Sequence, residues 1–494
     1  MAEGGNVGEF LLEAGEADAV AMIDRDGTHT YADLRAAVDI LAGRVAEWGL
    51  PPGARVGLLS RNSAFWAAAY LAILRSGLVA VPFATVLSPA DVLKKARFVD
   101  CDSFLVDSGL SRAFHDVVTS VGRVLSEAAL DGAGRGRQEV VPVEPDADAV
   151  LMFTSGTTSA PRAVRVSHRN IRANTTSIID YLDLTAEDRI LVVLPFSYCY
   201  GASLLHTHLR VGGSLAICDT IAFPETAIEQ IRQERCTGIA GVPSTYQSLL
   251  RSSSFETAAL PTLRTMQQAG GRLPQPQIER VAAAQPQARL FVMYGATEAT
   301  ARMSYLPPEL VRERQGSIGR GIPGVTLSVV DPDGRPVPPG VVGEVFARGD
   351  NITKGYWDDP EGTAAKFVDG GLRTGDLARA DEEGFLYVVD READFIKSWG
   401  IRISSHEIED AVVQLPGVAA AAVVGRPDEA AGESAVLFYV TSPGADLTPE
   451  QVLTHCRKTL AKPLVPHEVR RVGELPLNQN GKVLKTELRT LASS

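Results

Sequence analysis

Apolar and polar positions follow two alternating periods along most of the chain. Residues 31–48 carry apolar side chains at helical spacing, and Thr30 stands where the N-cap of an amphipathic helix would lie. A strand-length apolar run follows at 55–60, then a mostly apolar helical stretch at 65–74 and a second strand-length run at 78–83. This order predicts the α/β class, with parallel sheets covered by helices on both faces.

The same texture returns after residues 131–147, a stretch rich in glycine, proline and charge that we interpret as a surface connection. Further strand-length apolar runs lie at 150–153, 190–194, 215–218, 238–242 and 290–293. From about residue 325, closely spaced turn signals separate β-rich runs. This change predicts a smaller β element beside two helix-flanked main sheets.

The last hundred residues have a compact α/β pattern of their own. A helix, two strands and a second helix are predicted in turn at 405–414, 420–424, 435–441 and 449–460. A chain of 494 residues also calls for more than one domain, because single cores stop growing at roughly 250–300 residues. We therefore predict a large N-terminal region over residues 1–390 and a small, mobile C-terminal domain over 391–494.

Composition limits the partners and the compartment. The net charge is −12 and no block of Lys and Arg occurs, which argues against nucleic acid as a partner. The five cysteines are scattered without a CxxC pair, which fits a reducing compartment and predicts no zinc site. The acidic N-terminal segment lacks the pattern of a signal peptide, and no apolar stretch is long enough to span a bilayer. We therefore expect a cytoplasmic protein without a membrane span.

A loop of small hydroxyl residues, TSGTTSAPR at 154–162, follows the predicted strand at 150–153. Backbone N–H groups, hydroxyls and one cation in such a loop can wrap phosphate oxygens. The loop is not a Walker A motif, because Pro161 stands five residues after Gly156 and no Gly-Lys pair follows. On this segment alone, an ordinary Ser/Thr-rich surface loop competes with a phosphate site. The candidate phosphate-binding residues are Thr154, Ser155, Gly156, Thr157, Thr158 and Arg162.

The loop is similar to the phosphate-binding loop of the adenylate-forming superfamily, which includes acyl-CoA synthetases, adenylation domains of nonribosomal peptide synthetases and beetle luciferases. The other motifs stand in the family's order: YGATE at 294–298, GEVFARGDNITKGYW at 343–357, RTGD at 373–376, VVDREADFIKSWGIRISSHEIE at 388–409 and NQNGKVLKTELR at 478–489. The resemblance covers residues 28–489. It implies ATP-dependent activation of a carboxylic acid as an acyl-adenylate, release of pyrophosphate, and transfer of the acyl group to a thiol.

The resemblance also implies roles for single residues. Tyr294 would lie against adenine, and Asp376 would bind the ribose hydroxyls with Arg391 beside it. Thr297 would donate to the α-phosphate, and Glu298 would hold Mg²⁺, a hard cation that prefers carboxylate and phosphate oxygens. The expected ATP site is completed by Gly270, Gly271 and Gly295.

Lys482 is expected to be the main catalytic residue. The family's lysine at this position reaches from the small domain into the cleft and neutralises charge in the transition state, so it acts on rate more than on binding. Asp394 resembles the hinge residue between the domains, and the segment around Gly400 would line the thiol tunnel in a second orientation of the small domain. Lys485 and Arg489 are expected to be solvated side chains on one side of a terminal helix.

The segment at 194–205 resembles the family's acid pocket. In amino-acid-activating relatives an aspartate follows the aromatic residue at the position of Tyr198, whereas here Cys199 follows it and no Asp or Glu occurs at 194–213. A buried ammonium without a carboxylate partner is costly, so we expect an acid without an α-amine in an apolar or aryl-accepting pocket. The candidate pocket residues are Tyr198, Cys199, Tyr200, Gly201, Tyr246 and Met293. For Tyr200 and Tyr246, a role as core aromatics is the alternative.

The phosphate loop departs from the family pattern, because Ser159, Arg162 and Ala163 replace the usual Gly, Lys and Gly. Arg162 keeps the charge but not the compact ammonium, so slower or altered adenylation is expected. The departure leaves open a non-catalytic relative that binds nucleotide or acyl-adenylate. An amino- or imino-acid adenylation enzyme is a further alternative, and nothing specifies luciferase-like oxygen chemistry. The expected partners are ATP, Mg²⁺, a small carboxylic acid, and CoA or a phosphopantetheinylated carrier protein supplied in trans.

Overall fold

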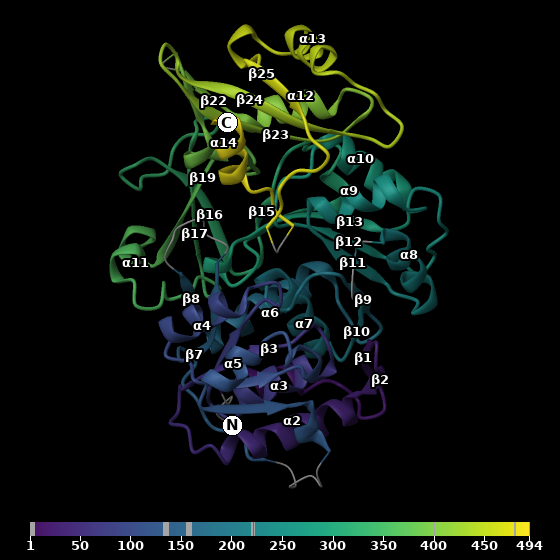
Figure 1. The fold of residues 1–494 in the computed structure, drawn as a ribbon, viewed down its shortest axis with the longest axis vertical. Helices are drawn as coiled ribbons and strands as arrows, with labels where there is room; N and C mark the ends of the chain where they lie inside the picture. The colour runs from purple at the N-terminus through teal and green to yellow at the C-terminus, as the bar shows by residue number, and fades with distance from the viewer. Residues whose placement is uncertain are drawn as a thin grey trace.

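The computed structural model describes residues 5–131, 138–154, 161–218, 221, 223–399, 401–478 and 481–493. In Figure 1 the two main sheets and their helices occupy the lower and middle parts of the molecule, a smaller sheet with β16 and β17 lies at the left, and the C-terminal domain lies on top. No helix among the described residues has both the length and the apolar character needed to cross a bilayer.

The first main sheet has nine strands. Their order across the sheet is β15 (Arg320–Gly321), β14 (Ser304–Leu306), β13 (Arg289–Tyr294), β12 (Thr265–Gln268), β11 (Gly238–Gly241), β9 (Arg189–Val192), β10 (Ser214–Ile217), β1 (Val20–Asp24) and β2 (Gly27–Thr30). The strands from β13 to β1 pair in parallel, and antiparallel pairs occur only at the two edges.

The second main sheet has six strands in the order β6 (Arg123–Ser126), β5 (Ser103–Val106), β3 (Arg55–Leu59), β4 (Val79–Pro82), β7 (Asp148–Phe153) and β8 (Ala163–Ser167). All neighbours are parallel except β7 and β8. Alternate residues of β7 enter different hydrophobic clusters: Val150 and Met152 lie in one, and Leu151 lies in the other. Both faces of this sheet are therefore buried, which explains why its strands read as unbroken apolar runs.

The N-terminal region contains the helices α1 (Val7–Leu12), α2 (Tyr31–Ala46), α3 (Ala64–Arg75), α4 (Pro89–Phe98), α5 (His115–Ser120), α6 (His168–Leu182), α7 (Cys199–Val211), α8 (Pro224–Gln233), α9 (Pro243–Ser252), α10 (Gln275–Ala284) and α11 (Pro360–Lys366). The predicted cap of α2 is present: Thr30 Oγ1 accepts from the Asp33 backbone N–H at 3.1 Å. The helix ends before residue 48, and Gly49 then adopts a left-handed φ of +61°.

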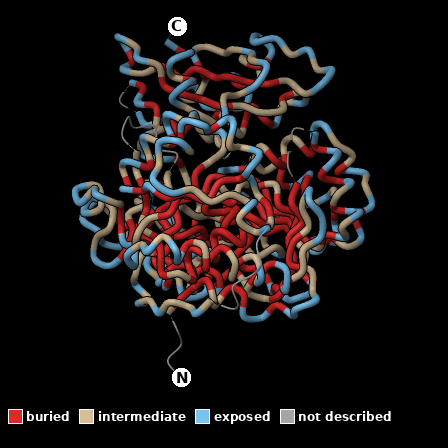
Figure 2. Tube along the Cα trace, turned by 60° about the horizontal axis from the view of Figure 1, so that its bottom comes forward, coloured by how far each residue is buried: buried red, intermediate tan, exposed pale blue. Residues whose placement is uncertain are grey.

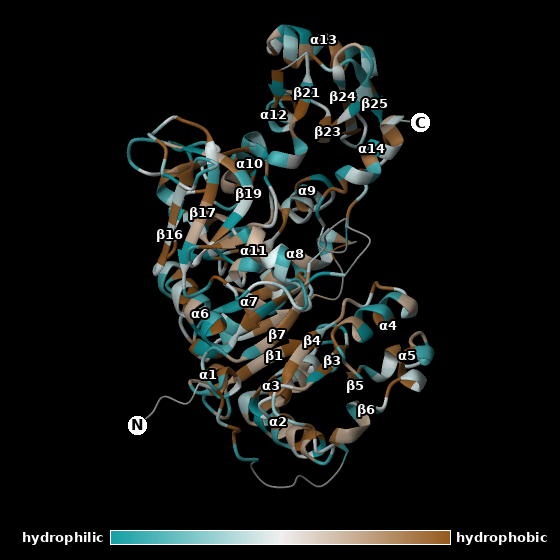
Figure 3. Cartoon of the chain, turned by 90° about the vertical axis from the view of Figure 1, so that its left-hand side faces the viewer, coloured by the Kyte–Doolittle hydropathy of each residue, from teal (hydrophilic) through white to brown (hydrophobic). Residues whose placement is uncertain are grey.

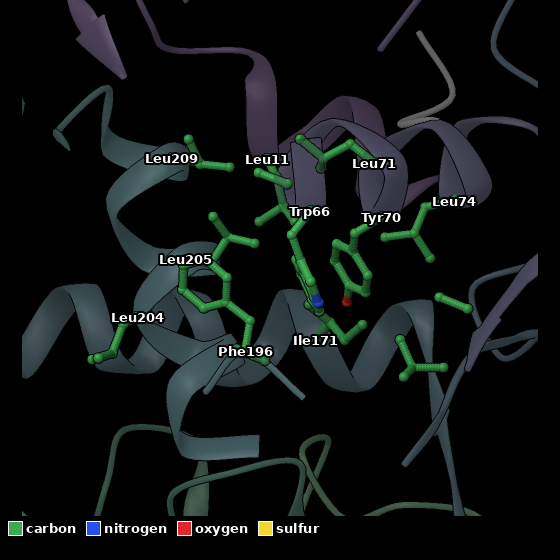
Figure 4. Packing of buried hydrophobic residues seen from close by; sticks show 14 of the residues in the cluster. Leu11, Trp66, Tyr70, Leu71, Leu74, Ile171, Phe196, Leu204, Leu205 and Leu209 are labelled. Carbon is green, nitrogen blue, oxygen red and sulfur yellow. The ribbon is translucent and has the colours of Figure 1, made fainter. Parts of the chain in front are cut away.

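Helix α3 is buried on nearly all sides, as expected of a helix with apolar residues around its whole circumference. Trp66 stacks on Tyr70 with ring centres 5.0 Å apart and meets Phe196 at 5.1 Å. Figure 4 shows these rings between α3 and α7, with Leu204, Leu205 and Ile171 around them. This packing holds the first turn of α7, which borders the candidate site.

The smaller sheet is antiparallel and consists of β16 (Val325–Val330), β17 (Gly343–Gly349), β19 (Gly371–Ala380), β18 (Phe367–Val368) and β20 (Leu386–Arg391). It is the β element predicted from the turn signals after residue 325. The predicted fold class is confirmed, and the hydrophobic colouring of the main-sheet strands in Figure 3 agrees with it. Within the predicted connection at 131–147, residues 138–147 form no helix or strand.

The C-terminal domain has a five-stranded sheet and three helices. They are β21 (Ile396–Ser398), β22 (Ile401–Ile403), α12 (Ser405–Val413), β23 (Val418–Asp428), β24 (Gly432–Thr441), α13 (Pro449–Thr459), β25 (Glu468–Arg471) and α14 (Lys485–Ser493). Two hydrophobic clusters draw their members only from residues 396–492. Figure 2 shows this separate buried layer above the larger core. A core of its own is what a separate domain requires.

Candidate active site

A cavity lies between the C-terminal domain and the ends of β12 and β13. Its lining residues are Tyr198, Cys199, Tyr200, Ala269, Gly270, Gly295, Ala296, Thr297, Ala301, Arg302 and Lys482. The segments after β12 and β13 contribute because they leave the carboxyl edge of the sheet, where ligands bind in open α/β folds. Among the described residues, the wall contains two cations and no carboxylate.

Three residues predicted to bind the nucleoside meet beside this cavity. The Tyr294 hydroxyl donates to Asp376 Oδ2 at 2.5 Å, and Arg391 Nε donates to Asp376 Oδ1 at 3.0 Å. Burial raises the pKa of the Tyr294 hydroxyl, so this group stays protonated and keeps its donor role. The Asp376 carboxylate is thus held by two donors from β13 and from the end of β20.

Glu298 lies beside the cavity in the short 3₁₀ turn Thr297–Ala299. The Tyr356 hydroxyl donates to Glu298 Oε1 at 2.8 Å. Within the described part of the chain no basic side chain forms an ion pair with Glu298 and no cluster of three metal-ligating groups occurs. A single carboxylate without a cationic partner fits Mg²⁺, which proteins commonly bind through one or two carboxylates together with substrate phosphates.

Lys482 reaches the cavity from the C-terminal domain; in Figure 1 the segment before α14 descends toward the middle of the molecule. Its backbone N–H donates to Asn478 Oδ1 at 3.0 Å, and its Nζ lies 6.0 Å from the centre of the Tyr198 ring. Burial lowers the pKa of the Lys482 ammonium, and the positive charge of Arg391 adds to this effect. The structure therefore brings Lys482 and Thr297 to the same cavity.

The acid side of the cavity is formed by the start of α7. Tyr198, Cys199 and Tyr200 line it, and Thr297 Oγ1 donates to Cys199 Sγ at 3.4 Å. Burial raises the pKa of the Cys199 thiol, which therefore stays neutral. Three other residues predicted for this pocket, Gly201, Tyr246 and Met293, do not line the cavity. They are buried behind its wall.

Arg302 lines the cavity although sequence reasoning missed it. Its side chain is almost fully buried, with 1% of the residue exposed. A signal was present in the sequence, because this arginine stands between the apolar residues Ala301 and Met303, four positions after the end of the YGATE motif. A charged residue inside an apolar run is rarely buried without a reason.

The predicted phosphate loop is described only at its ends. Ser155, Gly156, Thr157, Thr158 and Ser159 lie outside the described residues, as does Gly400 of the predicted thiol tunnel. At the loop's ends, the Thr154 backbone N–H donates to the Arg162 carbonyl at 3.1 Å. The Arg162 guanidinium lies 4.7 Å from the centre of the Tyr356 ring and 3.2 Å from the Asp359 carboxylate.

Two side chains of α14 that were expected to be solvated form ion pairs within the C-terminal domain. Lys485 Nζ donates to Ser405 Oγ at 2.6 Å and lies 3.1 Å from Glu409 Oε1. Arg489 Nη2 donates to Asp394 Oδ1 at 2.7 Å. The prediction of a solvated side chain is therefore wrong for Lys485, which is largely buried beside Glu409, whereas Arg489 stays partly exposed while it pairs with Asp394. The predicted hinge residue Asp394 is joined to α14 by this ion pair.

Comparison with known proteins gives the family. The sequence model of the AMP-binding enzyme family matches residues 13–357, and that of the AMP-binding enzyme C-terminal domain matches residues 407–482. A feruloyl-CoA synthase from an Amycolatopsis species is 32% identical over 470 residues, covering 93% of each chain. An indoleacetate–CoA ligase from Aromatoleum aromaticum is 30% identical and covers 98% of this chain and 96% of its own.

Two solved structures show the same fold. ATP-bound MatB from Rhodopseudomonas palustris has a TM-score of 0.92 at 27% identity, covering 99% of each chain. The o-succinylbenzoate CoA synthetase from Bacillus subtilis, in complex with its acyl-adenylate intermediate, has a TM-score of 0.87 at 27% identity and covers 98% of each chain. This chain belongs to the AMP-binding enzyme family. The predicted class is confirmed: it is an AMP-forming acid–thiol ligase.

Proposed function

We propose that this chain activates a small carboxylic acid without an α-amine as its acyl-adenylate and passes the acyl group to the pantetheine thiol of CoA. One observation carries the proposal: Lys482 of the C-terminal domain and Thr297 of the N-terminal region line one cavity, and its wall, as far as the structure describes it, contains no carboxylate. A substrate ammonium would find no counter-ion in that wall, whereas a carboxylate meets a cation there.

In the first step, a carboxylate oxygen of the acid attacks the α-phosphorus of ATP, the bond to the bridging oxygen breaks, and pyrophosphate leaves. Tyr294, Asp376 and Arg391 hold the nucleoside, and Thr297 donates to the α-phosphate. Lys482 neutralises the charge that develops between acid and phosphate, which lowers the barrier by electrostatic stabilisation rather than by covalent chemistry. Glu298 would hold Mg²⁺, which supplies positive charge to the departing phosphates.

In the second step, a thiolate attacks the acyl carbonyl carbon, AMP leaves, and the thiol proton passes to solvent. We place the domain division at residues 390 and 391, with Asp394 as the hinge and the segment around Gly400 lining the thiol tunnel. The names of the two CoA-ligating relatives support CoA as the acceptor. A carrier protein in trans presents the same phosphopantetheine and is the second acceptor to test. All five cysteines are free and buried, which supports a reducing compartment such as the cytoplasm.

The acid pocket supports a small, ring-bearing acid beside aromatic walls. The rings of Tyr198 and Tyr200 meet edge to face with centres 6.5 Å apart. The feruloyl, indoleacetate and o-succinylbenzoate enzymes to which the chain is similar are all named for aryl acids.

The proposal is tested by pyrophosphate release with ATP and Mg²⁺ across aliphatic, hydroxylated, aryl and amino acids, with hydroxylamine to trap the adenylate. Release with one group of acids, abolished in Lys482→Ala, is the expected result. Release with amino acids alone would favour the amino-acid adenylation alternative. Binding of ATP without release for any acid would favour a non-catalytic nucleotide-binding relative.

A further inference from the structure

Arg302 is a buried cation without an anionic partner. Its Nη1 donates to the Tyr181 hydroxyl at 2.9 Å and its Nη2 to Gln267 Oε1 at 3.1 Å. Its guanidinium carbon lies 5.1 Å from the centre of the Tyr200 ring. These groups are all neutral, and no Asp or Glu of the described residues pairs with this arginine. Buried guanidinium groups are normally paired with carboxylates, because a bare charge away from water is costly.

Two hydrogen-bond donors in this cluster have no acceptor. Arg302 Nε and Gln267 Nε2 are both buried and make no hydrogen bond. Turning the Gln267 amide would place its NH₂ group against the guanidinium and lose the bond from Arg302, so the unpaired group at Gln267 is a donor. The cluster therefore offers positive charge and unused donors, and what it lacks is an anionic acceptor.

The backbone around Arg302 gives this side chain a well-defined place. The Arg302 carbonyl accepts from Asn174 Nδ2 at 2.8 Å and from Asn351 Nδ2 at 3.0 Å. Both amides are buried. A cation presented to a substrate cavity from such a braced position is suited to recognise a charged group, because little conformational freedom is lost on binding.

The cavity thus has two cations with different surroundings. Lys482 comes from the C-terminal domain and stands beside Thr297 at the reacting end, whereas Arg302 belongs to the buried segment before β14. One carboxylate of the substrate can pair with Lys482, but Arg302 then still has no anionic partner.

We propose that the acid is a dicarboxylic acid, with one carboxylate activated beside Lys482 and the second bound by Arg302. This inference rests on the proposed function and names its substrate class. A guanidinium can donate two parallel N–H···O bonds to a carboxylate, which gives both charge and orientation. Arg302 acts as a specificity residue and takes no part in bond making.

The test compares matched acids with the wild-type enzyme. Short aliphatic and aromatic dicarboxylic acids are each assayed beside their half-amides and the corresponding monocarboxylic acids, by pyrophosphate release and hydroxamate formation. At least one diacid should exceed its half-amide by about a hundredfold or more in kcat/KM, because a buried charged site rejects a substrate that leaves it unpaired. Equal use of diacids and half-amides would overturn the inference and leave the adenylation activity established. If no acid leads to release of pyrophosphate, the proposed function itself is contradicted.

A variant then assigns the preference to Arg302. In Arg302→Met the diacid should lose most of its advantage, while the monocarboxylic acid is used as well as before or better. Arg302→Lys keeps the positive charge but cannot donate two parallel hydrogen bonds, so it should keep part of the preference for the diacid. Arg189→Met is the matched control, because Arg189 binds Ser214 and the Glu234 carbonyl in the same sheet and does not line the cavity. An unchanged preference in folded Arg302→Met would refute the assignment, and if that variant does not fold, the wild-type comparison decides.

Discussion

Gly481 lies directly against Ser244, so the residue before Lys482 touches the N-terminal region. A Cβ built on Gly481 would come 2.5 Å from Ser244 Oγ, and the φ of Gly481 is +73°. Only glycine combines this left-handed backbone with such a close approach. The contact lies one residue before Lys482, which lines the cavity.

We predict that Gly481→Ala slows adenylation by about tenfold or more, because a shift of the backbone moves Lys482 from its working position. The KM for ATP should change little. Gly444→Ala is the matched control: its φ is +78° and nothing lies within 4 Å of a Cβ built there. It should lower the unfolding temperature through backbone strain while leaving the pyrophosphate release rate intact. Equal slowing in both variants would show that the Ser244 contact is irrelevant.

The charge of Lys482 should shape the pH profile. Burial lowers the pKa of Lys482. The side chain is therefore protonated and active at low pH, and it loses its proton at a pH below the ordinary lysine pKa of about 10.4. We expect kcat/KM for ATP to fall along an alkaline limb in that window, since this ratio reports the free enzyme. The hydroxyl of Tyr198 does not interfere, because burial raises its pKa well above the usual value.

The Lys482→Arg variant tests whether the alkaline limb comes from the titration of Lys482 or of another group. Arginine stays charged throughout the accessible pH range, so the alkaline limb should disappear even if the overall rate drops. The limb is measured by initial rates of pyrophosphate release over a pH series. The same limb in Lys482→Arg would assign it to another residue.

The ion pair between Arg272 and Asp410 connects the loop before α10 with α12 of the C-terminal domain. Burial raises the pKa of Asp410, whereas the charge of Arg272 lowers it. The ionised form of the Asp410 carboxylate is therefore stabilised by Arg272. Arg272→Met should destabilise this orientation and slow adenylation by about fivefold, the effect of roughly 1 kcal/mol for a partly exposed pair.

Acyl transfer from a supplied acyl-adenylate to CoA provides the second readout for Arg272→Met, and it should be unchanged or faster. Arg280→Met is the control, because Arg280 pairs with Glu256 at 2.7 Å within the N-terminal region. Equal loss of both half-reactions in Arg272→Met would point to general damage rather than to domain orientation.

Arg162 packs on the tyrosine that binds Glu298. Its guanidinium covers the Tyr356 ring, and the Tyr356 hydroxyl donates to the Glu298 carboxylate. Arg162→Lys removes the flat stacking surface, so we expect a severalfold change in the KM for ATP. Arg165→Lys, which alters the nearby pair with Asp148, should have no such effect. An identical KM in Arg162→Lys would argue against a role for this loop position.

Much of the architecture was predictable because it depends on local pattern. The apolar runs at 55–60, 150–153 and 238–242 became β3, β7 and β11 within about two residues, since strands buried on both faces must be apolar throughout. The antiparallel edge strands β8 and β15 were not predicted, because pairing direction depends on how the chain returns to the sheet. The contacts of Lys485 and Arg489 also escaped prediction, because they depend on where the folded chain places α14 within the C-terminal domain.

The sequence by itself determined the family, the reaction class and the order of the chemical groups, because these follow from motifs that stay together along the chain. Only the tertiary structure decided that Lys482 shares one cavity with Thr297 and Arg302, since Lys482 lies far from both in sequence and on the other domain. It also decided which aromatic residues reach that cavity and which remain in the core behind it. Burial without an anionic partner is a property of the folded surroundings, and it sets Arg302 apart from the exposed arginines of this chain.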